Sequence, residues 1–491
     1  MTEEPSPAPI GVFGHLRRLA GHSAIYGAAD VLPYAVNLLL FPVFTRLLSP
    51  PEYALLALLA VLGAPLKILF RAGLDAGFFR IYYDLSTDTE RRTLAGTIAA
   101  ASAALGTILL LIGASTAGWI GDLLSSGAPL PARWVLLVFA EMYVGTLAIV
   151  PQALLRIQDR AHVFTGLALL RHALNIGLKV ALLVAGWGVE AILWSDLAST
   201  ALYVTAQLPI LRRGAALSWS APLLRRALHF GAPKVPHGIL VHAQNLADRR
   251  ILEGFVERTE LGLYHVGYTL ANAVKFPISA FEQAWQPFVY AQLGKADAPA
   301  TLSRVGTYFF AAFVSCGLAL AMLGREILVL LTRPEYHGAA AVIPVVVLAY
   351  LVHGFFLLTS IGIGIAKKAR YYPLITLAAA STNIAGNFLL IPGWGLLGAA
   401  WATVLSYTVM AAIGLAVSQR VYPLPVEWSR YARLAFAAAA TYGASRLVPI
   451  SIVPAIALKA ALLVGFPVLL WLLKFWTPAE IDRLRRLWTK S

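Results

Sequence analysis

The chain has 491 residues, of which 59% are hydrophobic and only 13% are charged, and its net charge is +15. Soluble domains carry roughly 25% charged residues, so this composition excludes a soluble globular protein and indicates an integral membrane protein. The positive charge does not indicate a nucleic-acid partner, because the bases lie in short loops between apolar runs.

The apolar runs are close to the ~20 residues that a helix needs to cross a bilayer, and they lack the alternation of an outer-membrane barrel. Only helices satisfy all backbone hydrogen bonds within one segment in lipid, so we expect an all-α fold. We predict about fourteen transmembrane helices, at residues 24–47, 54–79, 93–114, 133–154, 163–185, 190–210, 228–250, 261–289, 305–331, 341–365, 372–391, 396–418, 432–448 and 453–475.

The first and seventh predicted spans share a pattern of an aromatic-Gly start, an early proline and a terminal arginine. Gly27 and Arg46 are 19 positions apart, as are Gly231 and Arg250, which gives an offset of 204 residues. The same offset matches a base at position 71 to a base at position 275. The pattern therefore indicates a duplicated unit.

A second match lies near the end of each half, where Gly186-Trp187-Gly188 corresponds to Gly393-Trp394-Gly395 at an offset of 207 residues. One small loop insertion accounts for the drift of three residues. Internal repeats of this length in a membrane chain are typical of a transporter built from two similar halves.

Bases are concentrated in alternate loops, near residues 91–92, 156–160, 212–226, 367–370 and 420–430. By the positive-inside rule we expect these loops and both termini to be cytoplasmic. The tail at 477–491 begins with a capping box and predicts an interfacial amphipathic helix, with a solvated tail helix as the alternative.

The chain contains no phosphate-binding loop, Asp-x-Asp signature, metal-ligand spacing or nucleophile elbow, and no extramembrane loop is long enough to form a domain. These absences weigh against a glycan polymerase, a glycosyltransferase and an ATP-driven pump. We therefore expect a transporter rather than an enzyme, with no cofactor or metal.

Charged residues inside the spans are the candidates for function, because a charge at mid-bilayer costs ~2.5–3.5 kcal/mol and usually faces a cavity or a partner. The bases predicted to line a cationic substrate cavity are Arg46, Arg71, Arg171, Lys179, Arg249, Arg250 and Lys275. The acids predicted to couple an ion or to pair with a base are Asp30, Asp75, Asp248 and Glu282.

Helical spacing refines these candidates. Asp75 follows Arg71 by four residues, so the two share a helix face and pairing is an alternative to a proton site. Arg171 and Lys179 are eight residues apart on one face. For the arginines at the span ends, snorkelling to the interface competes with a ligand role. Glu141 is a further acid within a span.

Three runs carry a family resemblance: Leu48-Ser49-Pro50-Pro51-Glu52-Tyr53, the stretch from Gly73 to Asp84, and Asp248-Arg249-Arg250-Ile251-Leu252. With the fourteen-span layout, they resemble Wzx-type polysaccharide and O-antigen flippases of the multidrug/oligosaccharidyl-lipid/polysaccharide exporter superfamily. The resemblance implies two six-helix lobes and a terminal helix pair. The corresponding segments are a tail at 1–23, lobes at 24–213 and 214–419, the pair at 420–476 and the tail at 477–491.

The resemblance also implies a function. It is the movement of an undecaprenyl-pyrophosphate-linked oligosaccharide from the cytoplasmic to the periplasmic leaflet of the bacterial inner membrane, for lipopolysaccharide or exopolysaccharide synthesis. Coupling to H⁺ or Na⁺ and contact with membrane lipids and polysaccharide polymerase machinery would accompany it. The alternatives are a multidrug or cation antiporter or a lipid II flippase of the same superfamily, and a membrane enzyme of glycan synthesis.

Overall fold

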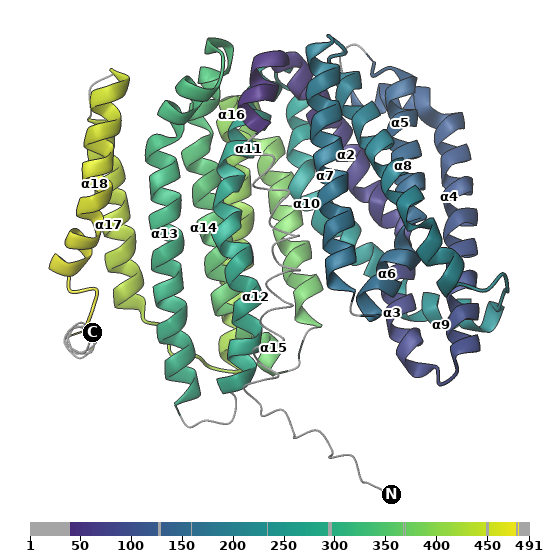
Figure 1. Cartoon of the computed structure of the whole chain (residues 1–491). Coiled ribbons are helices and arrows are strands. Elements are labelled where there is room, and N and C mark those ends of the chain that lie inside the picture. The colour runs from purple at the N-terminus through teal and green to yellow at the C-terminus, as the bar shows by residue number, and fades with distance from the viewer. Residues whose placement is uncertain are drawn as a thin grey trace, which may run out of the picture. The chain divides into compact units, whose positions relative to one another are not determined.

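The computed structural model describes residues 40–125, 129–158, 160–232, 234–292, 297–366, 368, 370–447, 451–477 and 480. These residues form helices and their connections, and no strand occurs among them (Figure 1). Eight helical segments within this part of the chain are long and apolar enough to cross a membrane. The predicted all-α membrane fold is confirmed, whereas the count of fourteen spans stays a prediction.

The chain divides into two compact units, and unit 1 contains residues 66–120 and 131–235 of the described chain. Its helices are the end of α2 (Pro50–Arg71), α3 (Leu74–Asp84), most of α4 (Asp88–Leu124), α5 (Ala132–Thr146), α6 (Ile149–Ile157), α7 (Ala161–Val184), α8 (Val189–Gly214) and α9 (Ala221–Gly231).

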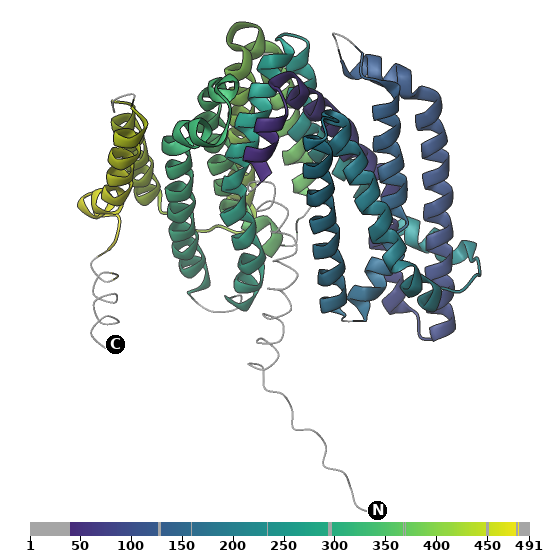
Figure 2. The same ribbon diagram turned by 45° about the horizontal axis from the view of Figure 1, so that its top comes forward.

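Unit 2 contains residues 40–65, 121–130 and the described residues from 236 onward. Its helices are the start of α2, α10 (Lys234–Glu253), α11 (Arg258–Ala271), η1 (Asn272–Val274), α12 (Lys275–Gln292), α13 (Ala298–Leu331), η2 (Pro334–Ala341), α14 (Ile343–Thr359), α15 (Ile361–Ile365), α16 (Tyr371–Val421), α17 (Trp428–Arg446) and α18 (Ile452–Leu472). The last two helices lie side by side in both ribbon views (Figures 1 and 2).

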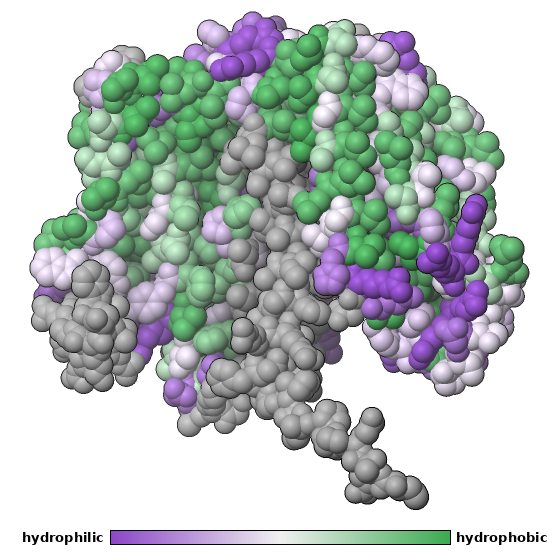
Figure 3. All heavy atoms as spheres, in the orientation of Figure 1, coloured by the Kyte–Doolittle hydropathy of each residue, from purple (hydrophilic) through white to green (hydrophobic). Residues whose placement is uncertain are grey.

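The surface of unit 1 changes in character along its helices. Hydrophobic residues cover much of α7 and α8, and hydrophilic residues gather at one end, over α3, α6 and α9 (Figure 3). This division is expected for helices that cross a bilayer and end in water.

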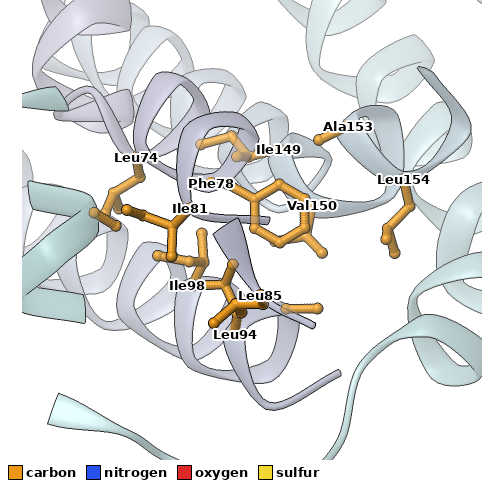
Figure 4. Packing of buried hydrophobic residues seen from close by; sticks show 12 residues of the cluster. Leu74, Phe78, Ile81, Leu85, Leu94, Ile98, Ile149, Val150, Ala153 and Leu154 are labelled. Atoms are coloured by element: carbon orange, nitrogen blue, oxygen red, sulfur yellow. The ribbon is translucent and has the colours of Figure 1, made fainter. Parts of the chain in front are cut away.

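An apolar core holds that end of unit 1 together, where α3, α4, α6 and α9 meet (Figure 4). Phe78 of α3 is fully buried there, between Ile98 of α4 and Val150 of α6. Burying a phenylalanine side chain stabilises the fold by about 1.5–3 kcal/mol. This core therefore holds α3 and α9 against α4 and α6.

Two helices begin at capping boxes. The hydroxyl and backbone N–H of Ser49 donate to the Glu52 carboxylate at the start of α2. At the start of α4, Thr87 donates to the Glu90 carboxylate in the same way, and the Glu90 N–H donates back to the Thr87 hydroxyl. A capping box satisfies N–H groups that have no partner within the helix. It explains why α4 begins five residues before its predicted span.

Several predicted spans are interrupted. The predicted helix at 54–79 is broken after Arg71, because Ala72 and Gly73 adopt left-handed backbone angles with φ of 44° and 70°. Breaks also separate α5 from α6, α11 from α12 and α14 from α15. Hydropathy averaged over a whole span does not reveal these breaks, because each break takes up only a few residues of an otherwise apolar segment.

The two Gly-Trp-Gly motifs from which the repeat was predicted end in glycines with matching backbone angles. Gly188 has φ 53° and ψ −132°, and Gly395 has φ 50° and ψ −127°. Both values lie in a region that essentially only glycine adopts. Gly395 also separates the predicted spans 372–391 and 396–418, which join in α16 across this kink.

Candidate functional site

A polar cluster lies where α2, α5, α7 and α8 of unit 1 face one another. Arg171 of α7 donates a hydrogen bond of 2.9 Å to the Thr200 hydroxyl of α8, and this hydroxyl donates one of 2.9 Å to Glu141 of α5. The Arg171 guanidinium also lies 3.5 Å from the Glu141 carboxylate. These residues line a small cavity of about 90 Å³ together with Lys67 and Arg71 of α2.

The cluster continues along α7 for two more turns. Lys179 forms an ion pair of 2.8 Å with Asp196 of α8. Asn175, between Arg171 and Lys179, donates to Asp196 at 2.8 Å and to Ser199 at 2.9 Å. The predicted common face of Arg171 and Lys179 is therefore the face that α7 turns toward α8.

Arg71 and Asp75 lie on either side of the break between α2 and α3. The Arg71 guanidinium is 3.2 Å from the Asp75 carboxylate, which also accepts the N–H of Ala76 at 2.8 Å. Both side chains are more than a third exposed, so the pair itself contributes little stability. It orients Arg71 at the point where the helix is interrupted.

The charges of this cluster are not neutralised within it. The bases Lys67, Arg71, Arg171 and Lys179 outnumber the acids Asp75, Glu141 and Asp196, which leaves a net charge of +1. The side chains of Arg71, Arg171 and Asp196 are 37–40% exposed. Exposure of a charge to acyl chains costs several kcal/mol, so this face requires a polar space beside it.

In unit 2, Lys275 lies at a helix interruption, as Arg71 does in unit 1. Lys275 is the first residue of α12, directly after the 3₁₀ turn η1, and is partly buried. Its ammonium group lies 4.6 Å from the centre of the Tyr350 ring, and the Tyr350 hydroxyl donates to Asn272 in the turn. No carboxylate pairs with Lys275 among the described residues.

An aromatic contact links Lys275 to a buried ion pair on α10. The ring of Tyr350 lies 5.9 Å from that of Tyr268, over which the Arg249 guanidinium stacks at 4.6 Å. Arg249 pairs with Asp248 at 3.3 Å, and both residues are at most 5% exposed. Snorkelling to the interface is therefore the wrong interpretation for Arg249.

The model of the family described as "Polysaccharide biosynthesis protein" matches residues 43–297, just over half of the chain. The chain belongs to this family.

Two solved structures support the fold of this polysaccharide biosynthesis protein. A lipid II flippase, MurJ, in an inward closed conformation aligns with a TM-score of 0.74 at 12% identity, over 91% of this chain and 99% of its own. A multidrug resistance MATE family transporter of the MOP superfamily, inward-facing, aligns with a TM-score of 0.58 at 16% identity, over 79% and 94%. No curated protein matches the sequence. The predicted family and transporter fold, rather than an enzyme fold, are confirmed.

The other residues that the sequence predicted for the site are Arg250, Arg46, Glu282 and Asp30. Arg250 donates to the Leu123 carbonyl at 2.9 Å and pairs with Glu253 at 3.5 Å within unit 2. Arg46 and Glu282 are exposed. Asp30 lies outside the described residues.

Sequence reasoning missed Lys67 and Asp196, and it treated Glu141 only as an isolated acid. One signal was present: Lys67 precedes Arg71 by four residues within an apolar run, so the two share a helix face. Asp196 follows the Gly-Trp-Gly turn by eight residues, but only the packing of α7 on α8 brings it to Lys179.

The runs that carried the family resemblance have structural roles in this chain. The carbonyl of Leu48 accepts a 2.6 Å hydrogen bond from the Tyr336 hydroxyl, and Tyr53 packs against the same ring. Because both residues are buried, this motif fixes the start of α2 within unit 2. The motif from Gly73 to Asp84 forms α3.

Proposed function

We propose that this protein moves an oligosaccharide linked to undecaprenyl pyrophosphate from the cytoplasmic to the periplasmic leaflet, by alternating access, for surface polysaccharide synthesis. The family supports a role in polysaccharide biosynthesis. The fold match to a lipid II flippase supports a lipid-linked substrate. The protein then resides in the bacterial inner membrane with both termini cytoplasmic, as its loop charges predict.

The placement of Arg71 and Lys275 carries this proposal. The two bases are 204 residues apart, at matching positions of the repeat, and each lies at a helix interruption inside its own unit. Discontinuous helices at matching positions of two repeats are typical of transporter binding sites. A pyrophosphate needs cations in a site of low dielectric constant, and the arginine fork fits phosphate oxygens.

The polar residues around Arg71 suit the sugar part of such a substrate. Arg171, Asn175 and Asp196 present donors and acceptors along one face of unit 1, and sugar hydroxyls require both. The acids of this face, with Asp75, are the proposed positions for coupling to H⁺ or Na⁺. Transfer of the product to a polysaccharide polymerase is part of the proposal.

The experiment is a deletion strain complemented with wild-type or variant genes, in which lipid-linked oligosaccharide exposed at the periplasmic face is measured by lectin binding to spheroplasts. The proposal expects the deletion to lose periplasmic oligosaccharide while the cytoplasmic lipid-linked precursor accumulates. Unchanged oligosaccharide together with lost efflux of a cationic dye would instead identify a drug antiporter.

A further inference from the structure

A groove of about 790 Å³ lies between α3 and α9 of unit 1, outside the polar cluster described above. Its lining contains Arg80 of α3, Arg225 and Arg226 of α9, and a single acid, Asp84. With His229 neutral, the charged residues of the groove sum to +2. The groove therefore attracts an anion.

The arginines of the groove are only partly neutralised. Arg80 pairs with Asp84 at 2.7 Å, and Arg226 lies 3.8 Å from the same carboxylate. Arg225 has no carboxylate partner among the described residues, and its side chain is exposed. The Asp84 carboxylate is thus shared by two arginines, and the guanidinium of the third, Arg225, is available to a ligand.

Apolar side chains lie next to these bases. Phe230 is 40% exposed, and with Pro222 and Ile81 it lines the same groove. On the other face of α9, Ala227 is buried in the core shown in Figure 4 and Leu228 packs against it. The helix is amphipathic, with its basic face exposed.

The groove lies at one end of an apolar segment that is long enough to cross a membrane, where lipid headgroups are expected. α3 is the last part of the apolar segment Pro50–Asp84, and α9 follows the end of α8 after a short connection. Hydrophilic residues gather over both helices in Figure 3, beside the apolar surface of α7 and α8. A basic amphipathic helix at this position is typical of contact with anionic lipid.

We propose that this groove binds the headgroup of an anionic phospholipid of the phosphatidylglycerol type. Arg225 and Arg226 would donate charge-assisted hydrogen bonds to the phosphodiester. Phe230 would contact the glycerol and the first acyl carbons. A lipid is favoured over a soluble phosphate, because only the lipid uses both the bases and the adjoining apolar side chains.

This proposal does not rest on the proposed transport function. The groove uses none of the residues assigned to the oligosaccharide, and its occupancy can be measured without any transport. Failure of the flippase experiment would leave it standing, and its own failure would leave the flippase proposal standing.

The test is native mass spectrometry of the purified full-length protein, titrated with short-chain phosphatidylglycerol or with phosphatidylcholine of the same chain length. We expect wild-type protein to bind phosphatidylglycerol more tightly. In Arg225→Gln/Arg226→Gln we expect phosphatidylglycerol to bind about tenfold more weakly or worse, and phosphatidylcholine to bind as in the wild type. The single variant Arg80→Gln should show a smaller loss.

The matched control is Arg212→Gln/Arg213→Gln, which removes the same charge from exposed positions at the end of α8 that do not line the groove. It should bind phosphatidylglycerol as the wild type does, and gel filtration checks that all variants are folded. Equal weakening in the control would overturn the proposal in favour of diffuse charge attraction. Equal binding of both lipids, or full displacement by millimolar inorganic phosphate, would overturn it as well.

Discussion

Lys459 of α18 and Glu326 of α13 form an ion pair of 2.7 Å inside the membrane-spanning part of unit 2. The Lys459 ammonium also donates to the Met322 carbonyl at 2.8 Å, and Glu326 is 2% exposed. The apolar cluster around Phe466 and Leu470 surrounds the contact between these helices. The ion pair therefore sets the register of α18 on α13.

Loss of one partner of this pair should destabilise the protein more than loss of both. Lys459→Met leaves a buried carboxylate without its cation, and we expect a loss of about 3–5 kcal/mol in unfolding free energy. The double variant Lys459→Met/Glu326→Leu should recover most of it. Thermal unfolding in detergent measures both, and a double variant as unstable as the single would contradict this account.

Arg71→Ala and Lys275→Ala should each lower periplasmic lipid-linked oligosaccharide about tenfold or more, because each removes a charge-assisted contact to phosphate. Lectin binding to spheroplasts gives the readout, and immunoblots of membranes confirm that the protein is present. Arg133→Ala is the control, since Arg133 pairs with Glu190 and its side chain is 71% exposed. Normal export in both cavity variants would remove Arg71 and Lys275 from the proposed site.

Gly73→Ala should destabilise unit 1 by about 2–4 kcal/mol. A Cβ at Gly73 would lie 2.2 Å from the backbone oxygen of Gly231, and the φ of 70° disfavours any side chain. Gly177→Ala is the matched control, because no atom beyond the adjacent backbone of α7 lies within 4 Å of its Cβ position. There we expect no loss, or a gain of up to about 1 kcal/mol. Differential scanning fluorimetry separates the two outcomes.

The attachment of the chain after α18 should depend on pH. Arg430 donates to the Phe475 carbonyl at 2.8 Å and to the Glu480 carboxylate, and Glu480 accepts the Thr477 N–H at 2.8 Å. Burial raises the pKa of Glu480, but the hydrogen bonds from Thr477 and Tyr308 and the Arg430 charge outweigh it, so its pKa lies below the ordinary value of 4.5.

A depressed pKa means that Glu480 contributes stability above the unfolded value of about 4.5 and loses it as the pH falls through the folded value. Acid should therefore release the segment after Phe475, and Glu480→Gln should release it already at pH 7. Limited digestion by an acid-tolerant protease, followed by mass spectrometry of the C-terminus, measures the release. A wild-type protein that releases the segment equally at pH 3 and pH 7 would contradict this prediction.

Part of the candidate site could be predicted from residue spacing alone. Asp75 follows Arg71 by one helical turn, and the two do pair. Arg171 and Lys179 share a face, as their separation of eight residues predicts. The second prediction succeeds because a continuous helix places residues about four or eight apart on the same side. Arg71 and Asp75 pair although the helix breaks between them.

Other parts of the site could not be predicted, because they depend on helices that are distant in the chain. Glu141 meets Arg171 only because α5 and α7 both pack on α8. The residues next to Asp248 and Arg249 in the sequence do not show whether this ion pair is buried or interfacial. It is buried because the ring of Tyr268 on α11 covers the Arg249 guanidinium. The breaks in the predicted spans are equally invisible to hydropathy.

The amino-acid sequence by itself determined the membrane class and the helical fold, because transfer to lipid and backbone hydrogen bonding act along each segment. The matching angles of Gly188 and Gly395 follow from a motif that is readable in the chain. The tertiary structure alone decided which intramembrane charges on different helices pair, which are buried and which remain exposed. Those outcomes depend on which side chains packing brings opposite each charge. The partners are far apart in the chain, so the periodicity of the sequence does not predict them.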